Sequence, residues 1–445
     1  MAAVLWFRRD LRLADLPALL AASDAAGAEV LACYVLDPRL LASSGQRRLQ
    51  YLYDALRVLR DGLDGRLLVI RGDPRRCIPA VAEAVGATSV HVSQDHSPFG
   101  RRRDEQVRDA LPDVELVATG SPYLVSPGRV SKGDGTPYKV FTPFYDAWRR
   151  HGWRKPAESS SMSARWIDPG DVPALAGTVE IPDAGIELEL PAGERAAREQ
   201  WQRFVREGLD GYDDDRNRPD LAATSRMSAH LKFGTIHPRT MAAELGYGKG
   251  AQAYLRELAF RDFYASVLRE WPDSVWWNWN KSFDAIEVDD GDDAENAFAA
   301  WKAGRTGFPI VDAGMRQLAE TGFMHNRVRM IVASFLVKDL HLPWQWGARW
   351  FLDQLVDGDM ANNQHGWQWA AGCGTDAAPY FRVFNPTTQG KKFDPSGEYV
   401  RRWVSELADV ADVHKLDSDR PDDYPEPILD HGQERTEALR RYNAL

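Results

Sequence analysis

Short apolar runs alternate with helix-like segments in the part of the chain before residue 120. In chain order the runs read AVLWF, EVLACYVLD, LLVIRGD, SVHVSQ and VELVAT, and each has the length of a buried strand. Segments such as GQRRLQYLYDALRVLRDGL separate them, with apolar residues at helical spacing. Asp73 followed by Pro74 predicts the start of one such helix. The pattern predicts an α/β domain over residues 1–128, built on a doubly wound, five-stranded parallel sheet.

The pattern changes twice after residue 128. Residues 129–195 are rich in Gly, Ser, Pro and Asp, which favours a connector between domains. Residues 196–445 instead carry apolar residues three and four positions apart, as in AQAYLRELAFRDFYASVLRE and MHNRVRMIVASFLVKDL. Twelve of the 16 tryptophans lie beyond residue 200, so this part also has many aromatic side chains to bury. We therefore expect residues 196–445 to form an all-helical domain.

Composition limits the functional class without deciding it. With 44% hydrophobic and 27% charged residues the chain resembles a water-soluble globular protein, and its apolar runs are shorter than the roughly 20 residues of a membrane span. Charges near the N-terminus argue against a signal peptide, and Cys33, Cys77 and Cys373 are too few for a disulfide framework, so we expect a cytoplasmic protein. The net charge of −10 argues against nucleic acid as a partner, although acidic runs such as VDDGDD are typical of solvated loops and leave room for a basic groove.

Residues 357–380, DGDMANNQHGWQWAAGCGTDAAPY, concentrate most of the candidate chemistry. A calcium loop is disfavoured because Ala361 occupies the position of the third oxygen ligand. The G-x-G-x-x-A pattern that begins at Gly372 lacks a preceding strand, and His365 lacks the Cys or His neighbours of a zinc site. No metal is therefore expected. A turn packed with core tryptophans and a cofactor site both remain open.

A flavin is the cofactor that these residues suit. Its ring needs polar partners and an aromatic surround, and its pyrophosphate needs hydroxyls and a cation. The segment TSRMS at 224–228 offers hydroxyls and an arginine, and Asp357 with Arg329 is expected to form a buried pair beside the ring. In the 254–268 segment Tyr254, Glu257 and Arg261 lie on adjoining helix faces, where a Glu–Arg pair is equally typical of a surface salt bridge.

Four ordered motifs carry a resemblance to a known family. They are LWFRRDLRLADLPAL at the start, TSRMS at 224, GFPIVDAGMRQL followed by MHNRVRM at 307–330, and DGDMANNQHGWQWAAGCGTDAAPYFRVFNP from 357. The chain resembles the photolyase/cryptochrome family, in particular class I cyclobutane pyrimidine dimer photolyases, over nearly its whole length. The resemblance implies FAD bound in the helical domain, with binding residues Tyr212, Thr224, Ser225, Arg226, Met227, Ser228, Tyr254, Asn326, Arg329, Asp357, Asp359 and Asn363.

The resemblance also implies an activity, which is light-dependent repair of cyclobutane dimers in UV-damaged DNA by a carbon–carbon lyase. Excited reduced FAD would pass an electron to a dimer flipped out of the duplex, the ring would split, and the electron would return. The matching catalytic and lesion-pocket residues are Glu257, Phe260, Asn326, Met330, Asn363 and Trp369, with Arg216, Arg327 and Lys391 as DNA contacts and Trp367 and Trp344 as electron-transfer residues. Asn363 is expected beside flavin N5, which favours repair over sensing. The family resemblance implies a monomer.

Three positions depart from the family pattern. Phe260 stands where class I members place a tryptophan against the dimer, which reduces the stacking area. The outer tryptophan of the electron-transfer chain is missing near Gly291, and Trp346, Trp350, Trp276, Trp277 and Trp279 are alternative exits. The loop DHSPFGRRRD lacks the Asn-Glu pair of folate-binding members, so 8-hydroxy-5-deazaflavin is favoured over methenyltetrahydrofolate as a second chromophore, unless that site is empty.

Two rival functions remain open at this stage. A cryptochrome-type light sensor would use the same flavin without repairing DNA, although such sensors often carry a long tail that this sequence does not show. A light-independent flavin oxidoreductase would need a nicotinamide site, and the sequence has no fingerprint for one. A requirement for light would separate this oxidoreductase from both the photolyase and the cryptochrome-type sensor.

Overall fold

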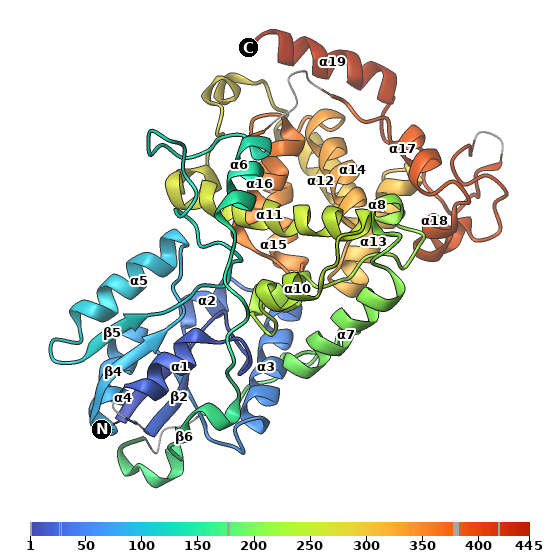
Figure 1. Ribbon diagram of the computed structural model, residues 1–445. Coiled ribbons are helices and arrows are strands. Elements are labelled where there is room, and N and C mark those ends of the chain that lie inside the picture. The colour runs from blue at the N-terminus through green and yellow to red at the C-terminus, as the bar shows by residue number, and fades with distance from the viewer. Residues whose placement is uncertain (1, 26, 28, 176–178, 377–381, 417–418) are drawn as a thin grey trace. The chain divides into compact units, whose positions relative to one another are not determined.

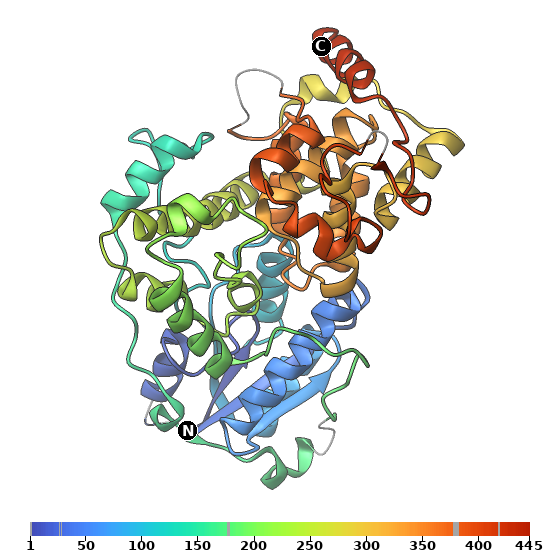
Figure 2. The ribbon, with the colours of Figure 1, turned by 90° about the vertical axis from the view of Figure 1, so that its right-hand side faces the viewer.

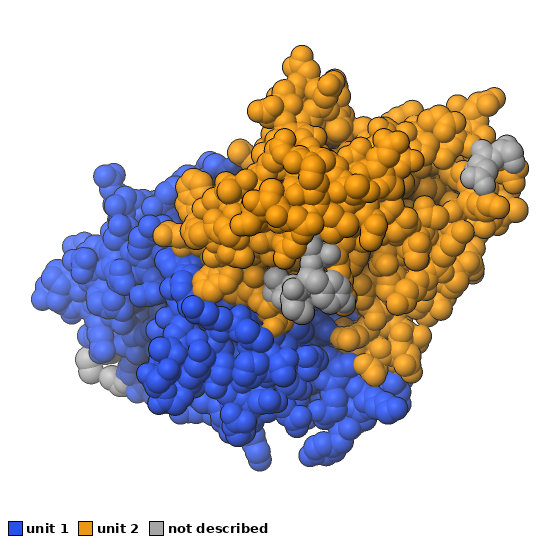
Figure 3. All heavy atoms as spheres, turned by 90° about the horizontal axis from the view of Figure 1, so that it is seen from above, with its two compact units in different colours: residues 1–210, 225–272 blue, residues 211–224, 273–445 orange. Residues whose placement is uncertain are grey.

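The computed structural model describes residues 2–25, 27, 29–175, 179–376, 382–416 and 419–445. The chain divides into two compact units, which are coloured separately in Figure 3. Unit 1 comprises residues 1–210 and 225–272, and unit 2 comprises residues 211–224 and 273–445. The chain therefore passes from one unit to the other after residues 210, 224 and 272.

Unit 1 contains the parallel sheet that the sequence predicts. Its main strands lie in the order β3-β2-β1-β4-β5, and each neighbouring pair is parallel. Helices lie beside this sheet in both views (Figures 1 and 2). The strands are β1 (Ala2–Phe7), β2 (Glu29–Leu36), β3 (Leu67–Arg71), β4 (Ala87–Val92) and β5 (Glu115–Ala118). The order reverses between β1 and β4, which is where such sheets form a ligand crevice at their carboxyl ends.

Two-residue strand β6 (Arg165–Trp166) extends the sheet by pairing with the start of β2. It was not predicted, because two residues are too short to show an alternation of apolar and polar positions. The helices around the sheet are α1 (Pro17–Asp24), α2 (Pro38–Ala42), α3 (Gln46–Asp61), α4 (Pro74–Ala84) and α5 (Pro98–Asp109). The predicted helix start at Asp73 is confirmed, since its carboxylate accepts a hydrogen bond from the Arg75 backbone N–H at 3.0 Å.

The segment predicted as a connector contains regular structure. Helix α6 (Phe141–His151) buries Phe141, Phe144, Tyr145 and Trp148, which recur at three- and four-residue spacing. Three short 3-10 turns follow, at Ser161–Ser163, Pro169–Asp171 and Pro173–Leu175. The remaining helices of unit 1 are α7 (Glu194–Glu207), α9 (Ser228–Phe233), α10 (Pro238–Glu244) and α11 (Lys249–Glu270). Helix α6 packs against α11, so this segment contributes to the core of unit 1.

Unit 2 is helical, in agreement with the predicted fold class. Helices α13, α14, α15 and α16 pack around Val311, Leu318, Ile331, Phe335 and Phe351, which are all buried. None of the helices in the described ranges combines the length and the apolar character needed to cross a membrane. The elements are α8 (Tyr212–Asp215), α12 (Gly291–Ala303), α13 (Pro309–Thr321), α14 (Asn326–Lys338), α15 (Trp344–Gln354), α16 (Met360–Ala371), α17 (Pro386–Phe393), α18 (Glu398–Trp403) and α19 (His431–Asn443), with 3-10 turns at Pro272–Val275, Lys281–Ala285 and Ser405–Leu407.

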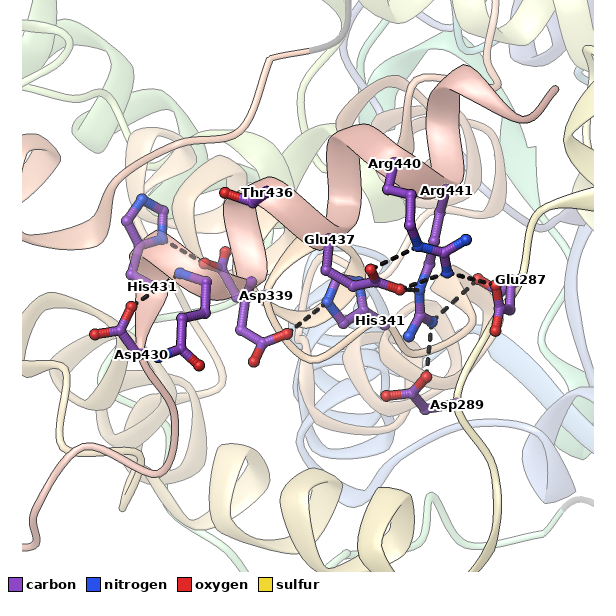
Figure 4. A network of polar contacts seen from close by, with 12 residues as sticks. Glu287, Asp289, Asp339, His341, Asp430, His431, Thr436, Glu437, Arg440 and Arg441 are labelled. Carbon is purple, nitrogen blue, oxygen red and sulfur yellow. Dashed lines mark hydrogen bonds and ion pairs between the residues drawn. The ribbon is translucent and has the colours of Figure 1, made fainter.

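Polar contacts fasten the last helix, α19, to the rest of unit 2 (Figure 4). His341 pairs with Glu434 at 2.8 Å, and His431 pairs with Asp339 at 2.5 Å. Further along the helix, Arg441 contacts Asp289 at 2.7 Å. Ala438 and Arg441 are the buried residues of this helix, and partly buried Tyr442 packs against the core, so α19 has few apolar contacts beside its ion pairs and hydrogen bonds.

Candidate functional site

An ion pair between half-buried Arg329 and buried Asp357 joins α14 to the loop before α16. Arg329 Nη2 donates to Asp357 Oδ2 at 2.9 Å, and Arg329 Nε donates to the Met324 carbonyl at 2.8 Å. The expected pairing of Arg329 with Asp357 is therefore confirmed. Asp357 is 9% exposed, and within the described residues its Oδ1 is buried without a hydrogen-bond partner. A buried carboxylate oxygen in this condition is costly unless a ligand donates a hydrogen bond to it.

Helix α16 carries the amide side chains of the candidate site. Asp359 is its N-cap and accepts from the Asn362 backbone N–H at 3.2 Å. Asn363 uses Nδ2 twice, to the Ala348 carbonyl at 2.9 Å and to Gln364 Oε1 at 2.8 Å. Its Oδ1 accepts no hydrogen bond from the described part of the chain, so it remains available as an acceptor. The interpretation of this stretch as a turn is wrong, because residues 360–371 are helical; residues 377–380 lie outside the described residues.

The hydroxyl-bearing segment 224–228 divides between the units. Thr224 belongs to unit 2, together with buried Tyr212, whereas residues 225–228 belong to unit 1. Within unit 1, Ser225 Oγ lies 2.8 Å from Tyr254 Oη, and the Ser225 carbonyl accepts from Gln200 Nε2 at 2.7 Å.

The backbone of this segment turns sharply at Arg226. Arg226 adopts a positive φ of 52°, its side chain is exposed, and Met227 behind it is 1% exposed. Ser228 then begins α9 with an exposed side chain. Hydroxyls and a cation therefore line one short turn, as an anionic group requires.

Buried Tyr254 anchors this turn from α11. Its ring contacts Trp201 at 5.1 Å and Phe204 at 5.2 Å between centroids. Burial raises the pKa of Tyr254, so its hydroxyl stays protonated and can share a hydrogen bond with Ser225. The structure thus brings Tyr254 and Ser225 together, as two of the expected cofactor-binding residues.

Helix α11 also presents the expected lesion-pocket residues of unit 1. Glu257 and Phe260 are both half-buried. Arg261 is buried and donates to the carbonyls of Pro122 at 2.8 Å and Leu231 at 3.0 Å. Arg261 therefore lies in the interior of unit 1. It is not part of the surface Glu–Arg salt bridge that its spacing from Glu257 would also allow. Glu257 and Phe260 lie three residues apart, which places them on neighbouring parts of the helix surface.

The first turn of α14 holds the expected DNA-contacting arginine. Arg327 donates to Asn217 Oδ1 from Nε at 3.2 Å and from Nη2 at 2.7 Å, and its guanidinium lies 4.4 Å from the Phe393 ring centroid. Burial and neighbouring Arg216 lower the pKa of Arg327. Asn217 and Phe393 were missed by sequence reasoning, because their role appears only when distant segments meet.

Neutral His325 caps this helix. Burial lowers the pKa of His325 to about 4, so its Nδ1 is free to accept from the Arg327 backbone N–H at 3.1 Å. Asn326 is exposed beside it, and Met330 is half-buried one turn later. Helix α14 packs against α16, which carries half-buried Trp369. Lys391 is exposed near the end of α17.

The expected electron-transfer residues are both buried in unit 2. Trp344 is 4% exposed and donates from Nε1 to Asn278 Oδ1 at 2.8 Å, and Trp367 is 3% exposed. Trp367 contacts the rings of Trp301 and Phe351, with centroids 6.1 and 5.0 Å away. Trp301 in turn contacts Phe298 at 5.7 Å, which contacts half-buried Trp346 at 5.2 Å. Sequence reasoning missed Trp301, which is fully buried and precedes the motif at 307 by only a few residues.

Comparisons with known proteins agree over the whole chain. A sequence family described as DNA photolyase matches residues 3–161, and one described as FAD binding domain of DNA photolyase matches residues 254–444. The chain is 40% identical to a protein of Halobacterium salinarum named deoxyribodipyrimidine photo-lyase, over 98% of this chain and 97% of that protein.

Solved structures show the same likeness. A bacterial class III photolyase from Agrobacterium tumefaciens has a TM-score of 0.89 at 35% identity, over 100% of this chain and 97% of that one. A cryptochrome from Synechocystis sp. PCC6803 has a TM-score of 0.88 at 25% identity, over 99% of this chain and 98% of that one. The fold is thus shared between proteins named for repair and proteins named as cryptochromes.

Proposed function

Because the chain belongs to the photolyase/cryptochrome family, we propose that it is a deoxyribodipyrimidine photolyase, a lyase that splits cyclobutane pyrimidine dimers in DNA under light. The observation that carries the proposal is the set of polar groups around Asp357. In the part of the chain that matches the FAD-binding domain, Arg329 pairs with a carboxylate whose second oxygen is buried and unpartnered, and Asn363 keeps Oδ1 available. Hydrogen-bond acceptors of this kind suit the N–H groups of a reduced flavin ring.

FAD is the cofactor of the helical domain, and the residues present fit it. Asp357 Oδ1 and Asn363 Oδ1 would accept from N–H groups of the bound ring, while the hydrogen bond from Arg329 holds the Asp357 carboxylate in place. In unit 1, Ser225, Ser228 and Arg226 would offer hydroxyls and a cation to the pyrophosphate, with Met227 and Tyr254 as further expected contacts. In unit 2, the further expected contacts are Tyr212, Thr224, Asn326 and Asp359. Bound FAD in its reduced form supplies the light-excited electron that opens the cyclobutane ring.

Each unit carries expected lesion contacts of its own, on α11 in unit 1 and on α14 and α16 in unit 2. The carboxyl of Glu257 donates a hydrogen bond to a dimer carbonyl, and Phe260 and Trp369 offer aromatic surface to the flipped bases. Asn326 and Met330 complete the polar and apolar contacts from one face of α14. The expected contacts to DNA phosphates are Arg327, Arg216 and Lys391. The net charge of −10 by itself argued against such contacts.

A second chromophore in unit 1 belongs to the same proposal. Arg8 follows β1 and donates from Nη1 to Asp104 Oδ1 at 2.6 Å, and Arg103 lies 5.1 Å from the Trp6 ring centroid. Within the described residues, Asp10 Oδ2, Arg8 Nε and His96 Nε2 are buried without hydrogen-bond partners. These groups suit a polar aromatic ligand at the switch point of the sheet, and 8-hydroxy-5-deazaflavin is favoured over methenyltetrahydrofolate. Domain 1–128 would then hold the second chromophore and domain 196–445 the FAD, while residues 129–195, expected as the connector, also contribute α6 to the core of unit 1.

The test is repair of a cyclobutane thymine dimer in a short oligonucleotide. Protein with chemically reduced FAD is given the substrate under blue light and in darkness, and restored thymines are measured. Restoration in light alone supports the photolyase. Absence of repair in light, with reduced FAD bound, assigns the chain to the cryptochrome-type sensors instead, and repair in darkness contradicts both functions.

A further inference from the structure

Phe260 has an aromatic partner inside unit 1. Its ring is stacked on the ring of Phe141 from α6, with centroids 3.4 Å apart and ring planes only 5° apart. Tyr264 is the other ring near Phe260 in the described part of the chain, and it lies farther away at 6.1 Å and tilted by 38°. One face of Phe260 is thus covered by Phe141, while the side chain as a whole remains half-buried.

Phe141 is itself held on several sides. It is 1% exposed, and it contacts Tyr145 at 5.7 Å in a stacked arrangement and Phe263 at 5.7 Å edge to face. The Arg256 guanidinium lies 4.9 Å from its ring centroid, and Arg256 precedes Phe260 by one turn of α11. Helix α11 therefore engages the Phe141 ring at two successive turns, through a cation and through a stacked ring.

A separate contact fixes α6 against α11. Asp262, on α11, accepts from Trp148 Nε1 of α6 at 3.0 Å and from the Val125 backbone N–H at 2.8 Å. Trp148 is fully buried and Asp262 is 1% exposed, so these bonds are shielded from water. The Phe141–Phe260 stack therefore connects two helices whose relative position is already set, and it leaves Phe260 little freedom to tilt.

From this geometry, and resting on the function proposed above, we propose that Phe141 is a positioning residue for lesion binding. It holds the Phe260 ring in one plane, so that a flipped pyrimidine base stacks on an aromatic surface that is already ordered. A base that stacks on a mobile side chain must also order that side chain, which weakens binding. The phenylalanine pair thus compensates for the smaller ring at position 260, where the family pattern has a tryptophan.

The test compares variants that differ in contact with Phe260. Phe141→Met and Phe141→Leu remove the stacked ring, and Phe144→Met and Phe144→Leu are the matched controls. Phe144 is 2% exposed on the same helix, and its ring contacts in the described structure are Tyr138 and Phe263. The FAD-loaded protein is titrated in darkness with one oligonucleotide that contains a thymine dimer and with its undamaged counterpart, and repair under saturating light is measured separately.

The Phe141 variants are expected to raise the dissociation constant for dimer DNA roughly three- to tenfold, as the loss of one pre-ordered side chain implies. Binding of undamaged DNA and repair at saturating substrate stay unchanged, and Phe141→Tyr, which keeps the ring, retains the affinity for dimer DNA. In a Phe260→Leu background, Phe141→Met has no further effect, because the ring that it orients is gone.

Two results overturn the inference. One is equal weakening by the Phe141 and Phe144 variants, which assigns Phe141 a purely structural role. The other is an undiminished effect of Phe141→Met in the Phe260→Leu background. The proposed function is tested separately, on the wild-type protein. It is contradicted if the wild-type protein shows neither light-dependent repair nor a preference for dimer DNA.

Discussion

Trp301 meets Trp367 edge to face, with ring centroids 6.1 Å apart and planes at 69°. The relationship matters because the sequence places no tryptophan at the expected outer position near Gly291. Ring contacts continue from Trp301 through Phe298 to Trp346, which is half-buried. Trp344 makes no ring contact within the described residues, although it lies in the buried core.

Replacement of Trp301 by Phe is expected to slow light-driven reduction of oxidised FAD more than Trp344→Phe does. The reason is that Trp301 makes the ring contact with Trp367 and continues toward Trp346. Loss of the Nε1 hydrogen bond to the Val332 carbonyl should also cost about 1 kcal/mol of stability. Transient absorption of the tryptophan radicals and of the flavin gives the comparison, with thermal unfolding recorded for both variants. Slower reduction in Trp344→Phe than in Trp301→Phe would assign the main route to Trp344.

Asp357→Asn is expected to weaken FAD binding about 10- to 100-fold, since a hydrogen bond to a charged group contributes about 1.5–3 kcal/mol. The variant keeps the shape of the side chain but removes the charge that pairs with Arg329. Titration of the apoprotein with FAD measures the change. Glu406→Gln is the control, because it breaks a comparable pair with Arg316 in the same unit. Equal losses in both variants would show that general destabilisation, and no contact with FAD, is responsible.

Asn363→Leu removes the available Oδ1 acceptor and should make the two-electron potential of bound FAD more negative by about 20 mV. A neutral hydrogen bond to the reduced form contributes about 1 kcal/mol, and about 1.4 kcal/mol corresponds to 30 mV for two electrons. Spectroscopic titration against a redox dye measures the potential, and thermal unfolding separately reports the lost bond from Nδ2 to Ala348. A potential shifted in the positive direction would place Asn363 against the oxidised form.

Arg327→Gln should lower the slope of log affinity against log salt for DNA binding by about 0.9, the contribution of one phosphate contact. Asn217 and the Phe393 ring hold this guanidinium in place, so Asn217→Ala should lower affinity with a smaller change in slope. Arg435 is exposed on α19 and serves as the matched control. An unchanged slope in Arg327→Gln would remove that residue from the DNA-binding surface.

Asp262→Asn should alter the pH dependence of stability between pH 4 and 6. Burial raises the pKa of Asp262 to about 6 in the folded chain, above its value in the unfolded chain. The unfolded chain therefore loses its proton first, and the contribution of Asp262 to stability falls as pH rises through this range, by roughly 3 kcal/mol in total. Urea unfolding of both proteins at pH 4 and 6.5 isolates this component. A pH-independent difference between the two proteins would show that the pKa of Asp262 is not raised in the folded chain.

Strand and helix positions in unit 1 were predictable because β1 to β5 are buried runs separated by helices with apolar faces. The Arg329–Asp357 pair was predictable too, since the two charges fall in a strongly apolar helical region. Helix α6 was not predicted, because the Gly- and Ser-rich residues around it dominate the composition. Its Phe141, Phe144, Tyr145 and Trp148 nevertheless recur at helical spacing.

Contacts that depend on tertiary structure could not be predicted from the sequence. The stack of Phe141 on Phe260, the Asn217 support of Arg327 and the ring contact of Trp301 with Trp367 all join segments far apart in the chain. Local spacing carries no information on such pairs, and a single sequence offers no covariation.

The attachment of α19 through His341, His431 and Arg441 has a consequence for cooperativity. A helix held by charges opens at a lower free energy than the apolar core formed by α13, α14 and α16. Amide hydrogen exchange should therefore reveal α19 as a separate unfolding unit, whose protection falls as salt is added while that of α14 does not. The end of the chain would then lose and regain its structure many times during one lifetime of the folded core.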